Sequence, residues 1–190
     1  LWILTAAAGV FAYDWPSLNK LPFSINNNPL FWKENVWNEI IVNTDGTVWL
    51  AGWMPQSYGI ARYDSIKNQF TEIARNLSET KRAMLTGDYY NRVSVCSKNR
   101  LLFSGFGGWN MVDRKGDILA AVNTEKYAVS NHRVEGIAED LSGKIWFATA
   151  EGLQVYNPAT DKVIRISQLD GLPTDNLVYG FHKCPNDILA

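Results

Sequence analysis

The sequence predicts an all-β protein made of repeated four-stranded antiparallel sheets, and three observations support this fold class. One pattern recurs roughly every 40 to 50 residues along the 190-residue chain. Each copy contains short β-branched and aromatic runs bounded by Gly, Asn, Asp or Pro, as strands usually are. No long segment shows clear helical periodicity, and the best candidate for one or two helical turns is 75–88.

Composition excludes several classes of protein. The formal net charge is −1, with 18 Lys and Arg against 19 Asp and Glu, so we expect no nucleic-acid partner and no broad contact with anionic lipid. Hydrophobic residues make up 46%, which is enough for a core, and no apolar run reaches the roughly 18 residues of a membrane helix. Two Cys exclude a disulfide scaffold. Aromatic residues are abundant, with 8 Trp, 8 Tyr and 8 Phe.

The clearest copy of the repeat is 142–158, SGKIWFATAEGLQVYNP. It reads as a polar turn, Trp between apolar residues, two small residues, Gly, and later an aromatic residue before Asn or Asp. Segments 1–14 and 45–64 match with extra residues before the Gly, 99–113 matches with Leu in place of Trp, and 186–190 begins a fifth copy. The recurring residues are Trp2, Trp49 and Trp146, then Gly9, Gly59, Gly108 and Gly152, and finally Tyr13, Tyr63 and Tyr156.

Each copy is expected to contain four strands, because four short apolar runs alternate with turn residues. In the fourth copy these strands are 134–139, 145–149, 153–156 and 163–167. A four-stranded unit of this period is the signature of a β-propeller blade, since one small sheet cannot bury both faces unless others stack against it. The predicted blade repeats are 1–35, 36–91, 92–132 and 133–176, with the start of a fifth over 177–190. We expect the repeated Trp to fill the space between neighbouring blades.

About four blades are present, and the chain begins and ends inside a predicted second strand. We therefore expect a fragment of a larger propeller. Unpaired sheet edges favour association with another chain, so the expected partners include adjacent blades of the same protein and a second copy in a homodimer.

Residues 140–176 resemble the propeller repeat of bacterial two-component regulators. The matching elements are the turn that starts at Asp140, Ile145-Trp146, Gly152-Leu153, Tyr156-Asn157-Pro158, and Gly171-Leu172-Pro173. The third copy departs from this repeat, because Leu102 replaces the Trp and Lys98-Asn99 replaces the Asp/Gly turn.

This resemblance implies a function as well as a fold. In that family, such repeats form propellers that typically have seven blades, in the periplasmic or extracytoplasmic part of an inner-membrane sensor that continues into a membrane helix and a histidine kinase. Many members occur in Bacteroidetes and sense oligosaccharides. The resemblance therefore implies a non-catalytic sensor region that binds an oligosaccharide or similar small molecule and needs no cofactor.

One face of the predicted propeller carries the candidate binding residues. Strand direction alternates within a blade, so the loops between second and third strands and the connections between blades lie on the same face, where loops can carry binding residues. The rings expected there are Phe31, Trp32, Trp53, Tyr58, Tyr89, Tyr90, Phe106 and Trp109, and the polar companions are Arg82, Asp88, Asn91 and Asn110. An aromatic ring offers an apolar plate to the C–H face of a sugar, which predicts a carbohydrate platform. The alternative is that these rings pack under the loops or against a partner domain.

Other residues predict no catalytic or metal site. The Gly-rich segment 105–108 is not followed by a helix that could present its amides to a phosphate. Cys96 and Cys184 lack the spacing of metal ligands, and His132 and His182 lack a catalytic motif.

Two alternatives to a sensor remain open. The turn at 43–49 is similar to the one in sialidase-like glycoside hydrolases, although one residue shorter, and a propeller can also serve only to bind other proteins. Asp45, Glu139, Asp140 and Glu151 occupy turn positions of the repeat, so we expect them to cap turns rather than to act as catalytic carboxylates.

Overall fold

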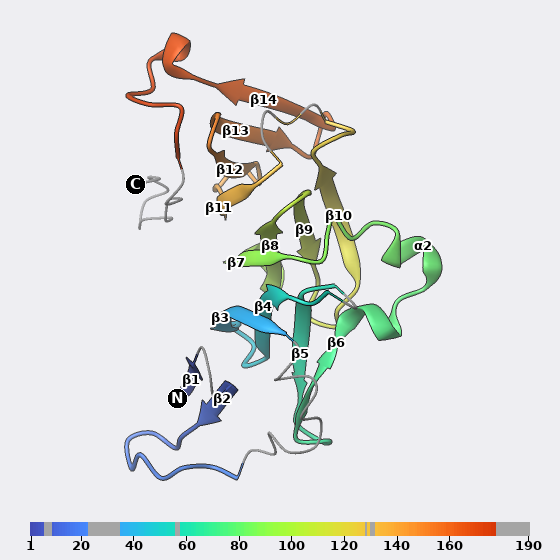
Figure 1. Cartoon of the computed structure of the whole chain (residues 1–190), viewed down its shortest axis with the longest axis vertical. Helices are drawn as coiled ribbons and strands as arrows, with labels where there is room; N and C mark the ends of the chain where they lie inside the picture. The colour runs from blue at the N-terminus through green and yellow to red at the C-terminus, as the bar shows by residue number, and fades with distance from the viewer. Residues whose placement is uncertain (6–8, 23–34, 56–57, 128, 130–131, 178–190) are drawn as a thin grey trace.

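The chain folds into successive antiparallel sheets. The computed structural model describes residues 1–5, 9–22, 35–55, 58–127, 129 and 132–177. The described strands form one two-stranded and three four-stranded sheets, and in each sheet every strand pairs with the next along the chain. Figure 1 shows the sheets stacked one after another along an arc. The predicted all-β architecture of four-stranded antiparallel blades is confirmed.

Each sheet takes its strands from one continuous stretch of the chain. The first sheet contains β1 (Trp2–Thr5) and β2 (Gly9–Ala12). The second contains β3 (Val36–Val42), β4 (Val48–Trp53), β5 (Ile60–Asp64) and β6 (Gln69–Glu72). The third contains β7 (Tyr90–Cys96), β8 (Arg100–Gly105), β9 (Gly108–Val112) and β10 (Ile118–Asn123), and the fourth contains β11 (Val134–Glu139), β12 (Ile145–Thr149), β13 (Gly152–Asn157) and β14 (Lys162–Ile166). The strands of the fourth sheet lie within about one residue of their predicted ranges, whereas β7 begins ahead of the predicted boundary at 92.

Helical structure in the described residues is limited to short turns. These are η2 (Ile73–Asn76), α2 (Glu79–Arg82), η3 (Ser97–Asn99) and η4 (Gln168–Asp170). The side chain of Ser78 caps α2 by accepting a hydrogen bond from the Lys81 backbone N–H at 3.3 Å. The helical turns expected within 75–88 are therefore present at α2. Within the described part of the chain, no helix has the length and apolar character needed to cross a membrane.

The turns between first and second strands differ between sheets, but each has a local cause. Asp45 accepts hydrogen bonds from the Thr47 backbone N–H at 3.0 Å and from its hydroxyl at 2.6 Å, and Asp140 accepts from the backbone N–H of Ser142 at 2.8 Å. In the third sheet Lys98 and Asn99 both have positive φ, of 60° and 56°. Two such residues in succession suit a tight hairpin turn, which explains how Lys98-Asn99 replaces the Asp/Gly turn.

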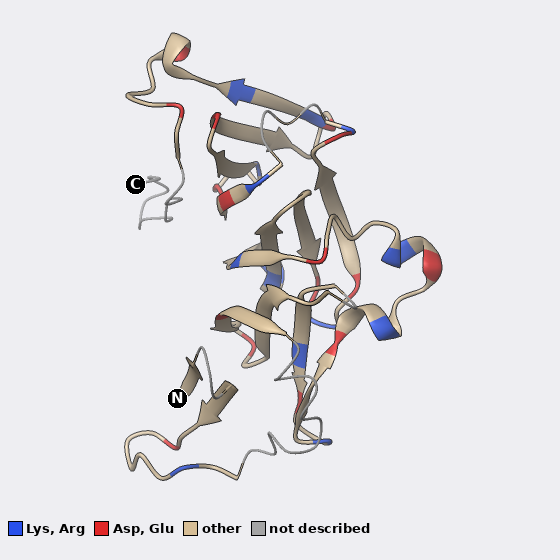
Figure 2. Ribbon diagram, in the orientation of Figure 1, with Lys and Arg blue, Asp and Glu red and all other residues tan. Residues whose placement is uncertain are grey.

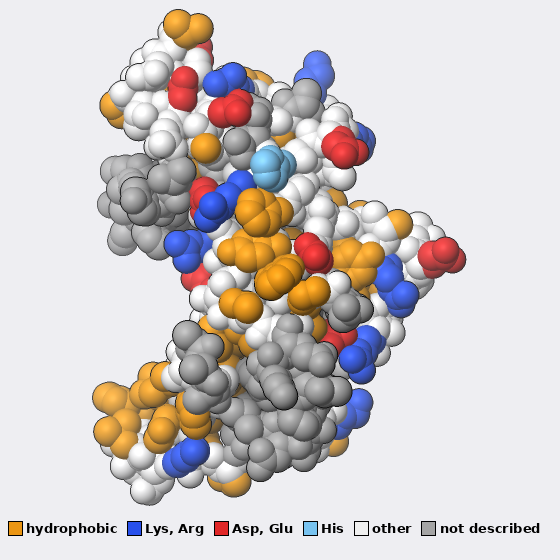
Figure 3. Space-filling view, in the orientation of Figure 1, with side chains coloured by type: hydrophobic (Ala, Val, Ile, Leu, Met, Phe, Trp, Pro, Cys, Tyr) orange, Lys and Arg blue, Asp and Glu red, His pale blue; other side chains and the backbone are white. Residues whose placement is uncertain are grey.

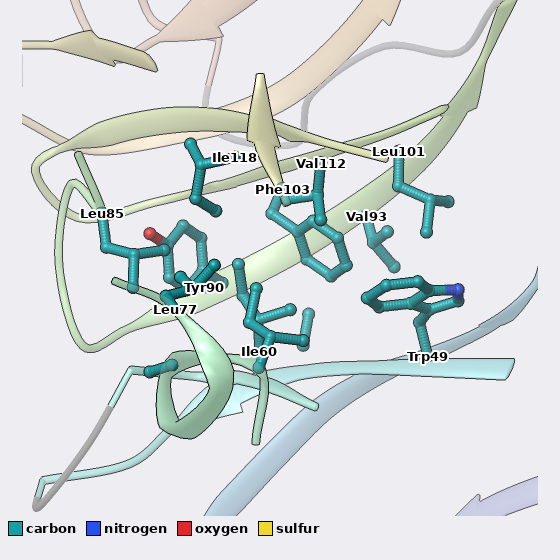
Figure 4. Close-up of a cluster of buried hydrophobic side chains, with 13 residues drawn as sticks. Trp49, Ile60, Leu77, Leu85, Tyr90, Val93, Leu101, Phe103, Val112 and Ile118 are labelled. Atoms are coloured by element: carbon teal, nitrogen blue, oxygen red, sulfur yellow. The ribbon is translucent and has the colours of Figure 1, made fainter. Parts of the chain in front are cut away.

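The hydrophobic core lies between the sheets. Trp49 of β4 is fully buried between the second and third sheets, where its ring centroid is 6.1 Å from that of Phe103 on β8 (Figure 4). Trp2 of β1 contacts the second sheet, with its ring centroid 4.9 Å from that of Tyr63 and 6.0 Å from that of Phe70. The second and third sheets thus bury both faces against neighbouring sheets, as stacked blades must.

The third and fourth sheets use different side chains for the same purpose. Leu102 is fully buried between these sheets, and the large ring beside it is Trp109 from β9. The Trp109 ring lies edge-on to Phe147 and Tyr156 of the fourth sheet, with centroid distances of 6.1 and 5.4 Å. A Trp from the adjacent strand therefore supplies the ring that the repeat places at position 102.

The first strands of neighbouring sheets are joined by carboxylates. The backbone N–H of Val93 on β7 donates to Glu39 of β3 at 2.6 Å. The Asn91 amide donates to Glu135 of β11 at 2.9 Å. In the same way Glu139 of β11 accepts from the backbone of Ser97 at 2.5 Å and forms an ion pair with Arg100. Glu139 therefore caps the η3 turn of the third sheet rather than a turn of its own sheet. Figure 2 shows acidic and basic residues interspersed over the sheets rather than gathered by sign.

Candidate ligand-binding site

Four aromatic side chains and one arginine form a continuous group at one end of the strands, which we call the aromatic strip. Its members are Trp53, Tyr89, Phe106, His132 and Arg133. Figure 3 shows hydrophobic side chains gathered beside the pale-blue histidine in the middle of this face. Trp53 is 42% exposed, and His132 and Arg133 are also exposed, so the strip is open to solvent.

The rings of the strip lie close to one another. The ring centroids of Tyr89 and Phe106 are 4.8 Å apart, and Phe106 and His132 are stacked with centroids 5.6 Å apart and an interplanar angle of 27°. The Arg133 guanidinium lies over Phe106 at 5.5 Å from the ring centroid. A cation above a ring face is attracted by the ring quadrupole, so Arg133 helps to hold the Phe106 ring in place.

Backbone hydrogen bonds between the loops hold the strip in position. The Met54 N–H donates to the Asp88 carbonyl at 3.0 Å, the Phe106 N–H donates to the Tyr89 carbonyl at 3.1 Å, and the Gly107 N–H donates to the His132 carbonyl at 2.7 Å. The Met54 and Gly107 bonds join one sheet to the next, and the Phe106 bond extends the pairing of β7 with β8 within the third sheet. The strip is therefore preorganised, which reduces the entropy lost when a ligand binds.

Glycine at 105 and 107 allows the loops to approach so closely. A Cβ atom on Gly105 would lie 2.0 Å from the Tyr89 carbonyl oxygen, and one on Gly107, whose φ is +86°, would lie 2.1 Å from the Thr86 carbonyl oxygen. The chain continues into β9 at Gly108 rather than into a helix, as the sequence predicts. Close packing therefore explains the Gly-rich segment without a phosphate.

The strip follows the repeat from one sheet to the next. Trp53 is the last residue of β4 and forms a β-bridge with Tyr89, which precedes β7. Phe106 follows β8 and forms a β-bridge with Arg133, which precedes β11. The two pairs occupy equivalent places, because each joins the end of a second strand to the start of the following sheet. At the equivalent place in the fourth sheet, after β12, the residue is the small Ala150.

An ion pair with a buried carboxylate positions Arg133. Its Nε donates to Glu135 at 2.5 Å, and the second oxygen of Glu135 accepts from the Asn91 amide. Glu135 is 5% exposed, whereas the Arg133 side chain is about half exposed. Arg133 therefore reaches solvent above Phe106 while its carboxylate partner stays in the core. Asn91, predicted to be a polar companion of the platform, lies below the surface as a partner of Glu135.

Three further residues predicted for the platform lie in the core. Trp109 is fully buried between the third and fourth sheets, so the prediction that it stands on the exposed face is corrected. Tyr90 and Asn110 are also fully buried, and the Tyr90 hydroxyl donates to Asn110 Oδ1 at 2.5 Å. The Asn110 amide donates to the Met84 carbonyl at 2.8 Å, and its Oδ1 accepts from the Thr86 N–H at 3.0 Å. Burial raises the pKa of Tyr90 to about 12, and the pair serves to anchor the segment that leads into β7.

The other predicted residues are divided between the strip and its surroundings. Tyr58 is half-buried and packs partly against the core between the second and third sheets, and the carbonyl of the exposed Asp88 supports the strip. Arg82 belongs to α2, where its guanidinium donates to the carbonyls of Ala74 and Leu77 at 3.1 and 3.3 Å. It therefore ties two helical turns together rather than facing the strip. Phe31 and Trp32 lie outside the described residues.

Sequence reasoning missed His132 and Arg133. The sequence places His132 in no catalytic motif, and Arg133 does not stand out. The available signal is the phase of the repeat, since both residues precede the first strand of a sheet as Tyr89 does. Among the described residues, no group of three His, Cys, Asp or Glu is placed to hold a metal ion.

Comparison with known proteins identifies the fold. No protein-family model matches the chain, and no curated protein sequence matches it. The extracellular domain of the hybrid two-component system BT4673 from B. thetaiotaomicron is 18% identical with a TM-score of 0.68, over 99% of this chain and 24% of that chain. The corresponding domain of BT3049 is 17% identical with a TM-score of 0.62, over 99% and 23%. Virginiamycin B lyase from Staphylococcus aureus is 16% identical with a TM-score of 0.58, over 82% and 48%.

These similarities concern the fold, because the sequence identities are low. The chain spans about a quarter of the length of the two extracellular domains that it matches. The arrangement of stacked meander sheets, with Trp rings between them, is the one that the repeat predicts. The chain is therefore a run of β-propeller blades, similar in fold to the extracellular domains of these hybrid two-component systems.

Proposed function

We propose that the chain is the ligand-binding part of an extracytoplasmic sensor and that the aromatic strip binds an oligosaccharide or a similar small molecule. The observation that carries this proposal is the row of exposed and half-buried aromatic rings on loops that backbone hydrogen bonds hold in place. The fold shared with extracellular domains of two-component systems supports a sensor. The parent protein would then span the inner membrane and carry, or contact, a histidine kinase.

The strip offers the two kinds of contact that sugars need. The exposed Trp53 ring, beside the half-buried rings of Tyr89 and Phe106, provides an apolar plate for sugar C–H groups. Arg133 provides charged donors for hydroxyl oxygens, and such hydrogen bonds are stronger than neutral ones. Because Arg133 is already held by Glu135, little side-chain freedom is lost on binding.

Signalling requires more than binding. A ligand shifts a conformational equilibrium only if it binds one arrangement more tightly than the other. The strip crosses from the second sheet to the third and on to the fourth, so a ligand lying along it contacts several blades at once. Such a ligand would favour one relative placement of the blades, and this is the change that the sensor would pass toward the membrane.

Replacement of the strip rings tests the proposal. We expect Trp53→Ala and Phe106→Ala each to weaken binding of a soluble oligosaccharide from a plant or host-glycan panel by roughly tenfold. Trp53→Ala removes an exposed ring, and Phe106→Ala removes the ring against which His132 and Arg133 are packed. Binding is measured by isothermal titration calorimetry. Trp15→Ala is the matched control, since Trp15 is 71% exposed but lies after β2, outside the strip. Equal affinity of all three variants and the unmodified chain would show that the strip does not bind glycans.

An assay for turnover separates a sensor from an enzyme. The fold is also similar to that of virginiamycin B lyase, so the fold does not decide between the two. Any oligosaccharide that binds is incubated with the chain and analysed by mass spectrometry. We expect it to be recovered intact, whereas cleavage products that disappear in a single carboxylate variant would identify a hydrolase or lyase instead.

A further inference from the structure

A second hollow lies at the opposite end of the strands from the aromatic strip. It has a volume of about 380 Å³ and lies between the second and third sheets, beside the β5–β6 turn and the β9–β10 turn. Both turns join a third strand to a fourth, whereas the strip is built on second-to-third loops and on the connections between sheets. This inter-sheet pocket is therefore a separate site, and a ligand that binds in it does so independently of the function proposed for the strip.

The pocket contains a departure from the repeat. Arg62 on β5 pairs across the second sheet with Trp49 on β4 and with Thr71 on β6, so all three lie on the face that meets the third sheet. The equivalent residues are Leu102, Met111 and Ala120 in the third sheet and Trp146, Val155 and Ile164 in the fourth. The second sheet alone among these three places an arginine and a threonine where the others place apolar side chains. Such a departure from a local rule is expected at functional sites.

Arg62 and Thr71 each have one buried polar atom without a hydrogen-bond partner among the described residues. The Nε of Arg62 and the Oγ1 of Thr71 are buried, and neither has a partner within the described part of the chain. The Arg62 guanidinium instead lies over the Trp49 ring at 5.7 Å from the centroid. A buried polar group without a partner costs free energy, so its retention calls for a ligand, ion or water that satisfies it.

The charges around the pocket favour an anion. Arg62, Lys67 and Lys115 line it together with the carboxylates of Asp64 and Asp117. Asp64 is already engaged, because it accepts from the backbone N–H groups of Ile66 and Lys67 and pairs with the Lys67 ammonium at 3.6 Å. Lys67 is thus paired with Asp64, and Arg62 and Lys115, one from each sheet, outnumber the Asp117 carboxylate among the other lining residues. Burial alone would raise the pKa of Asp45 on the turn before β4, and Arg62 is one of the groups that lower it.

We infer that this inter-sheet pocket binds an organic anion. Its carboxylate, phosphate or sulfate group lies between the Arg62 guanidinium and the Lys115 ammonium. Its apolar part lies against Ile73 and Leu77, which line the same pocket and are otherwise buried. A planar guanidinium binds an oxyanion in bidentate fashion, which suits Arg better than a point charge for this task. Because the ligand joins two sheets, its binding stabilises their packing.

Calorimetric titration of the 190-residue chain tests the inference with benzoate as the organic anion. Benzamide is the neutral analogue of the same shape, and inorganic phosphate and sulfate are the anions without an apolar part. We expect benzoate to bind more tightly than the other three. Arg62→Met should weaken benzoate binding by at least about tenfold. It should not unfold the chain, because Met111 occupies the equivalent place in the third sheet.

Two further variants make the result specific. Arg75→Met removes the same charge from η2, where Arg75 pairs with Glu72 at 2.8 Å outside the pocket, and should change benzoate affinity by less than about twofold. Lys115→Met removes the lysine that the third sheet contributes to the pocket. It should also weaken benzoate binding, and it provides a second test if Arg62→Met proves unstable. The inference is overturned by equal binding of benzoate and benzamide, by binding of phosphate or sulfate in preference to benzoate, or by no binding of benzoate up to about 10 mM.

Discussion

Asp140 holds the turn between β11 and β12 with a single carboxylate. It accepts from the backbone N–H groups of Ser142 and Lys144 at 2.8 and 2.9 Å, and from the Trp146 indole at 2.8 Å. Burial by itself would raise the pKa of Asp140, but the hydrogen bonds from Trp146, Ser142 and Lys144 outweigh it and lower the pKa below its ordinary value of 3.8. A lowered folded-state pKa contributes stability above the unfolded value, and this contribution is lost as the pH falls through the folded value.

Asp140→Asn should therefore destabilise the chain in a pH-dependent way. We expect a loss of about 1–2 kcal/mol in the free energy of unfolding at pH 7, because the neutral amide replaces charge-assisted hydrogen bonds. The loss should shrink as the pH is lowered below the ordinary value of 3.8, where the carboxylate is progressively protonated. Urea unfolding at several pH values measures it, with Glu125→Gln at an exposed position as the control. A loss that is the same at every pH would contradict this account.

At the scale of the element, the third sheet shows how the repeat tolerates an exception. Leu102 on β8 stands where β4 and β12 carry Trp, and Trp109 on β9 fills the neighbouring space between sheets. The two side chains lie on the same face, because Leu102 pairs with Met111, and Trp109 lies two residues before it on β9. The indole ring in this part of the core therefore comes from β9 rather than from β8.

Restoring the Trp at position 102 should therefore destabilise the sheet. We expect Leu102→Trp to lower the free energy of unfolding by about 1–3 kcal/mol, because Leu102 and Trp109 are fully buried and a second indole overpacks the core. Combining it with Trp109→Leu should recover part of the loss. Denaturant unfolding measures both, and Leu119→Trp at a 46% exposed position of β10 is the control. Full stability of the single variant would show that the space beside Leu102 is not filled.

At the scale of the whole molecule, carboxylates on the first strands join one sheet to the next. Glu139 is 6% exposed and pairs with Arg100 of the third sheet at 2.6 Å while accepting from Ser97 at two atoms. Glu39 and Glu135 make equivalent connections between other strands. Charge and hydrogen bonding therefore fix how the blades lie against each other, in addition to the apolar core.

Removal of one such carboxylate should loosen two sheets together. We expect Glu139→Ala to cost about 3–5 kcal/mol, because it leaves Arg100 and the Ser97 N–H without their partner in a largely buried place. Hydrogen exchange should then accelerate in both β7 and β11, whereas Glu125→Ala should leave both unchanged. Faster exchange confined to β11 would show that the contact does not couple the sheets.

Much of the fold follows from local sequence, while the site does not. The strands of the fourth sheet are predictable because short apolar runs are bounded by Asp140, Gly152 and Asn157, and these residues shape the backbone only within a few positions of themselves. The exposure of a ring depends instead on how sheets pack. Phe106 and Trp109 are near neighbours in sequence, yet Phe106 stacks at the surface and Trp109 is fully buried.

The repeat pattern alone is sufficient to specify blades, their order and the turns that join their strands, because β-strand alternation and turn chemistry are short-range properties. The tertiary structure was needed to place Arg133 over Phe106, to bury Tyr90 with Asn110, and to bring Arg62 opposite Lys115. Each of these juxtapositions joins residues from different strands or sheets. Their geometry depends on how sheets are stacked, and the local pattern of one strand carries no information about that stacking.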